Sequence, residues 1–201
     1  MQPSRRTQAD RSATTRAALI AAGRRLFAEP GFARIGAEAI VGAADVSRGA
    51  LYHHFGDKTE LFAAVLEQVE REVAEELAAV LRTADPDDDF VAAMTRAIEA
   101  WLDACERQEV QRIVLLDGPS VLGWTRWREI CQPYILGLVE AALTQAIADG
   151  IVDPLPVKPL AHALLAVADE AALFVASAPD KEAARSDMVT VAQRIVRSLT
   201  A

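Results

Sequence analysis

The chain of 201 residues has few aromatic residues, few cysteines and no long uninterrupted apolar run. Aromatics make up 5% of the sequence against 52% hydrophobic residues, which favours an Ala- and Leu-rich helical protein with an ample core. The lack of 18 consecutive apolar residues predicts no membrane-spanning segment and no membrane partner. The N-terminus is polar and Arg-bearing without the apolar core of a signal peptide, so a cytoplasmic location is expected.

Residues that would carry catalysis or hold a metal are also scarce. The two cysteines, Cys105 and Cys131, lie far apart and in no metal-ligand spacing, so buried free thiols are expected, with a redox switch as the alternative. His53 and His54 are adjacent, and neighbouring residues on a helix point about 100° apart, so they do not converge on one ion. We find no nucleophile–base set and no glycine-rich phosphate loop. The sequence therefore predicts no enzyme, no cofactor and no metal.

Charge is unevenly distributed along the chain. The net charge is −8, yet residues 1–60 hold nine basic and six acidic residues, while the remainder holds 12 basic and 23 acidic ones. Positive charge is thus concentrated in the first 60 residues, as contact with DNA phosphates requires. Arg5, Arg6 and Arg11 lie in a segment, 1–12, that lacks apolar periodicity and is expected to be a flexible basic arm. The arm is either a solvated tail or a contact to phosphates or a minor groove.

The stretch 35–61 predicts two short helices joined by a tight turn. The first covers Glu38 to Ala44, and Asp45, which tolerates a left-handed backbone, lies at the turn. Ser47 is a good N-cap for the second helix, whose Leu51 and Phe55 are four residues apart and face inward. This is the layout of a helix-turn-helix, in which the second helix enters the DNA major groove.

The same stretch resembles the signature of the tetracycline-repressor (TetR) family, and the resemblance covers roughly the first 65 residues. Two positions depart from the family pattern. Ile35 stands where a capping and phosphate-contacting Thr is usual, and Asp45 stands where a turn Gly is usual. The matching residues are Ala44, Val46, Ser47, Gly49, Leu51, Tyr52, His54, Phe55, Lys58, Glu60 and Leu61, preceded by Ile20, Ala21, Ala22, Leu26, Phe27, Gly31 and Phe32.

The resemblance implies a set of DNA contacts on the second helix and its flanks. It implies that Tyr52, His54 and Lys58 contact phosphates and that His53 reaches a base edge. Arg48 is chemically the best suited to a guanine, through its bidentate fork. Small residues near the helix start let the backbone approach the DNA. The full expected set is Gly36, Ser47, Arg48, Gly49, Ala50, Tyr52, His53, His54 and Lys58.

Helical periodicity continues to the C-terminus, and no strand pattern occurs. We predict an all-α fold, with a three-helix DNA-binding domain at 1–58 and a helical regulatory and dimerisation domain at 59–201. A first helix is expected at 14–28 and a long connecting helix at 59–82. Asp85-Pro86 predicts a helix start, and Asp117-Gly118-Pro119 predicts a break. The remaining expected helices are 86–106, 109–116, 120–130, 133–149, 160–176 and 180–199.

The second half offers candidates for a ligand site and for an interface. Polar residues among apolar ones, with aromatics nearby, are typical of a small-molecule site, although core packing explains any one of them equally well. The expected ligand-binding residues are Trp101, Asp117, Trp124, Trp127, His162 and Asp169. The helix at 160–176 is apolar on two faces, so a second subunit is expected to cover it. The expected dimer-interface residues are Leu164, Ala171, Phe174, Val191 and Ile195.

Together these features predict a ligand-responsive transcriptional regulator. We expect a repressor that binds double-stranded operator DNA, an inverted repeat, as a homodimer and is released by a small-molecule inducer of unknown identity. One alternative is an oxidation-sensing regulator that uses Cys105 and Cys131. Another is a helical small-molecule-binding protein or enzyme with a vestigial DNA domain, although the basic first 60 residues speak against it.

Overall fold

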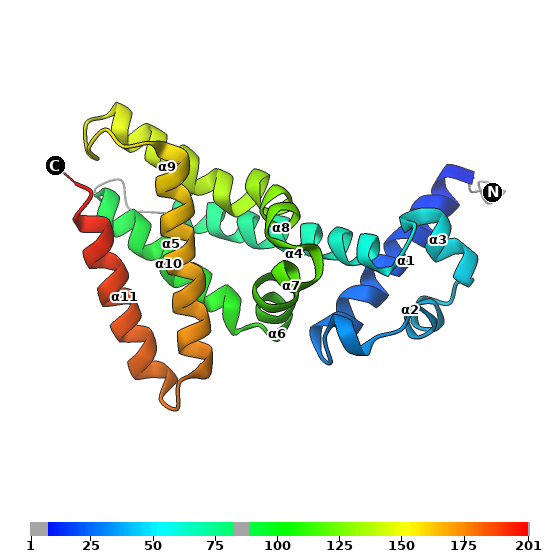
Figure 1. Ribbon diagram of the computed structural model, residues 1–201. Helices are drawn as coiled ribbons and strands as arrows, with labels where there is room; N and C mark the ends of the chain where they lie inside the picture. Colours follow the sequence, from blue (N-terminus) through cyan, green and yellow to red (C-terminus); the bar gives the residue numbers. More distant parts are fainter. Residues whose placement is uncertain (1–7, 83–88, 201) are drawn as a thin grey trace, which may run out of the picture.

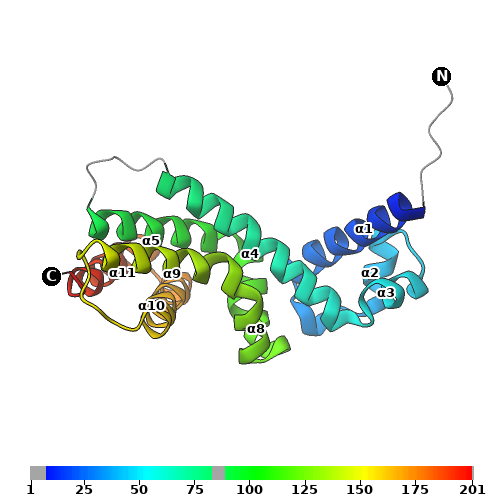
Figure 2. The ribbon, with the colours of Figure 1, turned by 90° about the horizontal axis from the view of Figure 1, so that it is seen from above.

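The computed structural model of the protein describes residues 8–82 and 89–200. Figures 1 and 2 show an elongated molecule with α1–α3 at one end and α5–α11 at the other. The long helix α4 runs from the first group into the second. Among the described residues there is no strand, and Val152 and Thr200 form an isolated bridge. The expected all-α fold is confirmed.

The N-terminal group begins earlier than the sequence pattern indicates. Helix α1 starts at Gln8, so residues 8–12 of the predicted arm belong to a helix, and residues 1–7 lie outside the described part. Leu19 and Phe27 of α1, Ile40 of α2 and Leu51 of α3 are each fully buried, and together they form the core of this end of the molecule. The elements are α1 (Gln8–Ala28), η1 (Phe32–Arg34), α2 (Ala37–Ala44) and α3 (Arg48–Phe55).

Helix α4 (Lys58–Arg82) connects the two groups because its buried side chains pack against both of them. Near its start, Leu61 and Phe62 are fully buried, and Phe62 packs edge-on against Phe27 and Phe32 of the N-terminal group. Farther along, Val73 and Leu77 are buried among the C-terminal helices. At 25 residues the helix is about 37 Å long.

The C-terminal group combines short helices with longer ones, and the long helix α5 packs directly against α4. Helix α5 begins at Phe90, where the Asp89 side chain accepts a hydrogen bond from the Ala92 amide; the start predicted at 85–86 lies outside the described residues. The elements are α5 (Phe90–Glu106), α6 (Gln108–Val110), η2 (Gln111–Asp117), α7 (Gly118–Leu122), α8 (Trp124–Cys131), η3 (Gln132–Leu136), α9 (Gly137–Ala148), α10 (Val157–Ser177) and α11 (Lys181–Arg197).

One boundary predicted from proline and glycine is wrong. The backbone stays helical through Asp117-Gly118-Pro119, where η2 passes directly into α7. The break comes instead at Gly123, whose φ of 75° is a left-handed conformation that favours glycine. The predicted start at Pro133 lies close to a kink, because the backbone of Tyr134 in η3 is non-helical (φ −110°, ψ −111°) and separates the helical stretch before it from the one that continues into α9. Segment η2 is also π-helical, and such segments often mark functional sites.

Candidate DNA-binding face and ligand site

The turn between α2 and α3 has the geometry of a helix-turn-helix. Asp45 adopts the left-handed conformation (φ 52°, ψ 47°), and the Val46 amide donates to the Val41 carbonyl. The Ser47 hydroxyl caps α3 by accepting from the Ala50 amide at 3.2 Å. Leu51 and Phe55 are buried, so the opposite face of α3 is open to solvent. The turn, the cap and the inward pair predicted from the sequence are confirmed.

The open face of α3 has a basic, hydrogen-bonding character. The Arg48 guanidinium donates to the Tyr52 hydroxyl at 3.2 Å and to Glu38 of α2 at 2.7 Å, and the pKa of Arg48 is raised, mainly by Tyr52 and then by Glu38. Arg48, Gly49, Tyr52 and His53 are exposed, whereas Ala50 and His54 are half-buried. A Cβ at Gly36 would meet nothing within 4 Å, and one at Gly49 only Ser47 Oγ at 3.8 Å. The surface of a bound partner can therefore approach the backbone closely at both glycines.

Lys58 makes contacts that the sequence did not reveal. Its Nζ donates to the carbonyls of Phe32 at 3.0 Å and Ile35 at 2.8 Å, and it lies 3.8 Å from the centre of the Phe32 ring. Partial burial lowers the pKa of Lys58. An ammonium has three N–H groups, so one remains for a phosphate. Lys58 thus fastens the start of α4 to η1, and its phosphate contact stays a prediction.

Asp117 already has protein partners, and its role as a ligand anchor stays a prediction. Its carboxylate accepts from the Phe32 backbone amide at 2.7 Å and pairs with Arg112 at 3.3 Å. Arg112 in turn covers Gly31 so closely that a Cβ there would clash with the guanidinium. Asp117 is therefore committed to a joint between η2 and the turn that follows α1. We call Gly31, Phe32, Arg112 and Asp117 the interdomain joint.

Further ion pairs connect the same two parts of the molecule. Arg24 of α1 donates to Glu72 of α4 at 2.6 Å and to both oxygens of Glu109 of α6 at 2.7 and 2.8 Å. The hydrogen bonds to Glu109 raise the pKa of Arg24 and lower that of Glu109. Arg126 of α8 pairs with both oxygens of Glu60, near the start of α4. These ion pairs connect α6 and α8 to α1 and α4.

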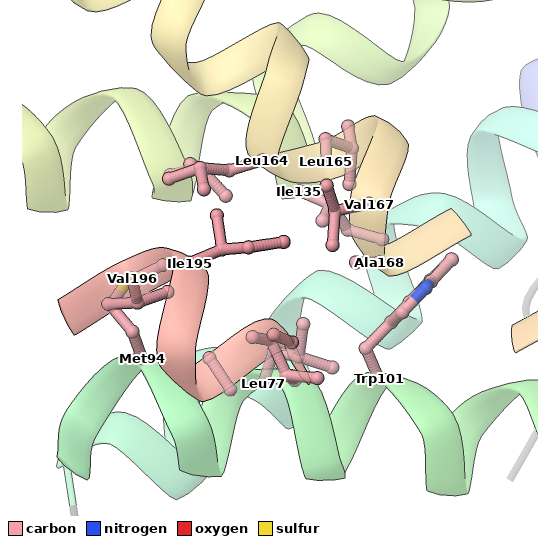
Figure 3. Close-up of a pocket in the computed structure, with 14 residues that line it drawn as sticks. Leu77, Met94, Trp101, Ile135, Leu164, Leu165, Val167, Ala168, Ile195 and Val196 are labelled. Carbon is pink, nitrogen blue, oxygen red and sulfur yellow. The ribbon is translucent and has the colours of Figure 1, made fainter. Parts of the chain in front are cut away.

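An apolar cavity lies inside the C-terminal group and encloses about 50 Å³. Figure 3 shows Met94 and Val196 near one end and Trp101 and Ala168 at the other. The lining side chains come from α4, α5, η3, α9, α10 and α11. Ligand sites usually enclose several hundred Å³, so a ligand has to push these helices apart. The lining is Leu77, Met94, Ala97, Ile98, Trp101, Ile135, Val139, Leu164, Leu165, Val167, Ala168, Ala192, Ile195 and Val196.

A buried polar cluster lies between helices α4, α8 and α10. Arg128 donates to Asp169 at 3.1 Å, and the Cys131 thiol hydrogen-bonds to Glu70. Burial raises the pKa of Glu70 to about 7 and that of Asp169 to about 6. The Arg128 guanidinium lies 4.1 Å from the Trp127 ring centre and 4.7 Å from that of Trp124. We call Glu70, Arg128, Cys131 and Asp169 the polar cluster.

The other predicted ligand residues do not share one place. Trp101 lines the cavity, whereas Asp169 belongs to the polar cluster and Trp127 packs on Arg128. Trp124 is 60% exposed and covers Arg128 from outside, so it lines no cavity. His162 is half-buried on α10 and is not among the cavity residues.

Sequence reasoning missed Glu70 and Arg128. Glu70 could have been found, because it lies four residues after Leu66 and seven before Leu77, on the apolar stripe of α4. A carboxylate on such a stripe is buried, and a buried charge needs a partner. Arg128 had no such signal, because α8 is amphipathic only over two turns and its neighbours Arg126 and Glu129 are charged.

Neither cysteine has the environment of a redox sensor. Cys105 and Cys131 are both buried, and desolvation strongly raises the pKa of each thiol. Reactive cysteines are exposed and have lowered pKa values, because the thiolate is the reacting species.

The outer face of α10 and α11 carries exposed apolar side chains. Phe174 is 49% exposed and Val191 is 51% exposed. Of the predicted interface residues, Ala171 is fully buried within the protomer and offers no accessible surface to a partner. Leu164 and Ile195 are half-buried and line the cavity, which links the outer helices to the interior.

The stretch Trp124–Ala148 and helix α10 are long and apolar enough to span a membrane by length and composition, and only 28% of each apolar window is buried in the protomer. Helix α10 nevertheless packs against α5, α9 and α11. Low burial therefore reflects an uncovered outer face.

The fold and these two sites define a helical DNA-binding protein whose long connecting helix also walls an internal cavity. Comparison with known proteins identifies its family. Residues 19–65 match the family described as "Bacterial regulatory proteins, tetR family", and residues 91–199 match "Tetracyclin repressor-like, C-terminal domain". The chain belongs to the TetR family.

Individual relatives agree with this assignment. The chain is 41% identical over 123 residues to the HTH-type transcriptional regulator CymR of Pseudomonas putida, and the match spans 61% of each chain. It is 27% identical to the transposon Tn10 TetC protein of Escherichia coli, over 68% of this chain and 67% of TetC. A TetR-family regulator from Pectobacterium atrosepticum superposes with a TM-score of 0.77 at 33% identity, covering 98% of both chains.

A crystal structure of RolR with the ligand resorcinol shares the fold. Its TM-score is 0.71 at 20% identity, and the match covers 94% of this chain and 96% of RolR.

Proposed function

We propose that the protein is a transcriptional regulator of the TetR family that represses its target genes and is released from DNA by a small molecule. The observation that carries the proposal is the continuity of one element. Helix α4 follows the DNA-reading helix α3 after two residues, and its Leu77 is a wall of the cavity. A displacement of α4 at the cavity therefore also displaces the DNA-binding end.

The DNA partner is an inverted-repeat operator. Arg48 and Tyr52 lie on the open face of α3, where they reach a base edge and a phosphate, and His53 lies beside them. Two copies of the protein place two such helices in successive major grooves about 34 Å apart. The site of action is the cytoplasm, where bacterial DNA is found.

The dimer forms through α10 and α11. Phe174 and Val191 are large apolar side chains about half exposed in the protomer, and Ala163 and Ala166 allow close approach of a partner helix. A four-helix bundle of two α10 and two α11 helices covers these residues. The small-molecule partner then acts from inside each protomer, since Leu164 and Ile195 of the same helices line the cavity.

Release follows from selective binding to one geometry of the dimer. The cavity of about 50 Å³ must widen to admit a ligand, which displaces α4, α10 or α11. The displacement reaches α1 through the interdomain joint and through the Arg24 ion pairs. A ligand shifts the equilibrium only by its difference in affinity for the two geometries, and a full switch requires about 5 kcal/mol.

Two experiments test the proposal. In a gel shift, the purified protein should retard DNA from the region upstream of its own gene and leave unrelated DNA of equal length free. A thermal-shift screen of small metabolites, repeated with that DNA present, should then reveal inducers whose binding is weakened by the DNA. If no DNA from the neighbourhood of the gene is bound specifically, the protein is no regulator of this kind.

Oxidation sensing is the weaker alternative, because both thiols are buried and have raised pKa values.

A further inference from the structure

The Arg48 side chain is held on the open face of α3 by two neighbours. Its guanidinium donates to Glu38 of α2 at 2.7 Å and to the hydroxyl of Tyr52, one turn along α3, at 3.2 Å. It also lies 5.5 Å from the centre of the Tyr52 ring. A free arginine side chain samples many rotamers, and these contacts restrict it. The side chain that is chemically best suited to a guanine therefore has a defined direction before DNA binds.

The ion pair between Glu38 and Arg48 contributes little to the stability of the fold. The two side chains are 71% and 61% exposed. An exposed pair gains little, because water screens the charges and two flexible side chains have to be fixed. Helices α2 and α3 already share one core, to which Ile40 and Leu51 contribute fully buried side chains. The ion pair is therefore not what holds the two helices together.

The Glu38 carboxylate also opposes the affinity for DNA. It lies beside Arg48, at the edge of the exposed face that carries Tyr52 and His53 and is proposed to meet the DNA. A negative charge in this place repels the phosphates of any sequence. Glu38 thus adds little to stability and lowers affinity, and its remaining effect is on the direction of Arg48.

The restrained guanidinium keeps enough hydrogen-bonding capacity to recognise a base. It has five N–H groups, and two of them are engaged by Glu38 and Tyr52. The O6 and N7 atoms of a guanine need two of the remaining three. Tyr52 accepts from Arg48 and keeps its own O–H for a phosphate oxygen. A phosphate contact by Tyr52 and a base contact by Arg48 are therefore compatible.

We propose that Glu38 is a positioning residue for base recognition, which accepts a hydrogen bond from Arg48 and thereby keeps the guanidinium toward a base edge and away from the phosphates. An unrestrained arginine that meets the wrong base can pair with a phosphate instead and retain its contribution to affinity. A restrained arginine leaves N–H groups unpaired against the wrong base. Specificity is a difference between two affinities, so the restraint increases it by weakening binding to wrong sequences.

This inference rests on the proposed function, because it concerns how the same face of α3 reads DNA. Double-stranded DNA with a randomised segment is first selected on the full-length wild-type protein. Arg48→Ala then identifies the base pair that Arg48 reads, as the position whose preference is lost in the variant. The measured quantity is the discrimination ratio: the dissociation constant for DNA changed at that base pair, divided by the one for the selected DNA.

Two variants of Glu38 separate its hydrogen bond from its charge. Glu38→Ala removes both, whereas Glu38→Gln removes the charge and keeps a carbonyl oxygen that accepts from Arg48. The discrimination ratio should fall about threefold or more in Glu38→Ala and stay within about twofold of the wild type in Glu38→Gln. Both variants should bind unrelated DNA more tightly, because a repelling charge is gone. An equal loss of discrimination in both variants would contradict the proposal.

A charge control and a double variant show whether Glu38 acts through Arg48. Asp45 is exposed in the turn before α3, and Asn tolerates the left-handed backbone there, so Asp45→Asn removes a nearby charge at little structural cost. Asp45→Asn should keep the wild-type discrimination ratio. The double variant with Glu38→Ala and Arg48→Ala should have the ratio of Arg48→Ala alone, because Glu38 has nothing left to position.

Several results overturn the proposal. They are an unchanged discrimination ratio in Glu38→Ala, an equal loss in Asp45→Asn, or a change of preference at any other base pair in Glu38→Ala, which would make Glu38 itself a base contact. Equal weakening of Glu38→Ala on all sequences would make the ion pair structural. The selection separates the two levels of inference. A wild-type protein that enriches no sequence refutes the proposed function, whereas an enriched sequence with an unchanged ratio in Glu38→Ala refutes the role of Glu38 alone.

Discussion

Replacing Glu70 with Gln should make the protein markedly less sensitive to pH. Glu70 is buried, and its pKa rises from about 4.5 to about 7 on folding. A carboxyl group with a raised pKa favours the folded state fully below about pH 4.5, and this contribution is lost as the pH rises through about 7. At about 1.4 kcal/mol per pH unit, the folded state loses about 3 kcal/mol in all, most of it between about pH 5 and pH 8.

The assay is urea unfolding of the wild type and of Glu70→Gln at equal protein concentration, at about pH 5 and about pH 8. Equal concentration matters because a dimer gains stability with concentration. The difference in unfolding free energy between the two proteins should change by about 2–3 kcal/mol between the two pH values, in favour of the variant at high pH. Glu75→Gln, on the exposed side of α4, is the control and should follow the wild type. Parallel pH profiles for wild type and Glu70→Gln would show that Glu70 is ionised normally and would refute the reasoning.

Four further outcomes are expected. Arg48→Ala should relax base preference at one operator position by about 1–3 kcal/mol, and equal weakening on all sequences would make Arg48 a phosphate contact. Asp117→Ala leaves the Phe32 amide unpaired, so the free energy of unfolding should fall by about 1–3 kcal/mol while inducer affinity stays constant. A loss of inducer affinity would show that Asp117 contacts the ligand. Phe174→Glu should yield monomers in sedimentation, and an intact dimer would show that the interface does not include Phe174. Thiol alkylation of the native protein should leave Cys105 and Cys131 unmodified, whereas rapid labelling would support the oxidation-sensing alternative.

Local signals predicted the DNA-binding end well. The turn at Asp45, the Ser47 cap and the inward pair Leu51 and Phe55 depend on residues within about ten positions of one another, and all are present in the structure. Lys58 shows the limit of such reasoning. Its hydrogen bonds go to carbonyls more than twenty residues away, and no local pattern indicates a tertiary contact of that kind.

The partners of the candidate ligand residues could not be predicted from the sequence, because they depend on which helix faces meet. Asp117 looked like a pocket residue beside an apparent helix break, but the helix continues there and turns the carboxylate toward Phe32. Ala171 looked suited to a helix–helix interface and is covered within its own protomer. Arg128 and Asp169 meet across 41 positions of sequence, a pairing that only the packing of α8 on α10 reveals.

The central claim is that the cavity and the DNA-binding face are coupled, and reciprocity of binding tests it most directly. The affinity of a fluorescent operator is measured by anisotropy with and without a saturating inducer, and inducer affinity is measured with and without saturating operator. The account predicts that each ligand weakens the other by the same factor, about tenfold or more. A tight cavity ligand that leaves operator affinity unchanged would contradict it.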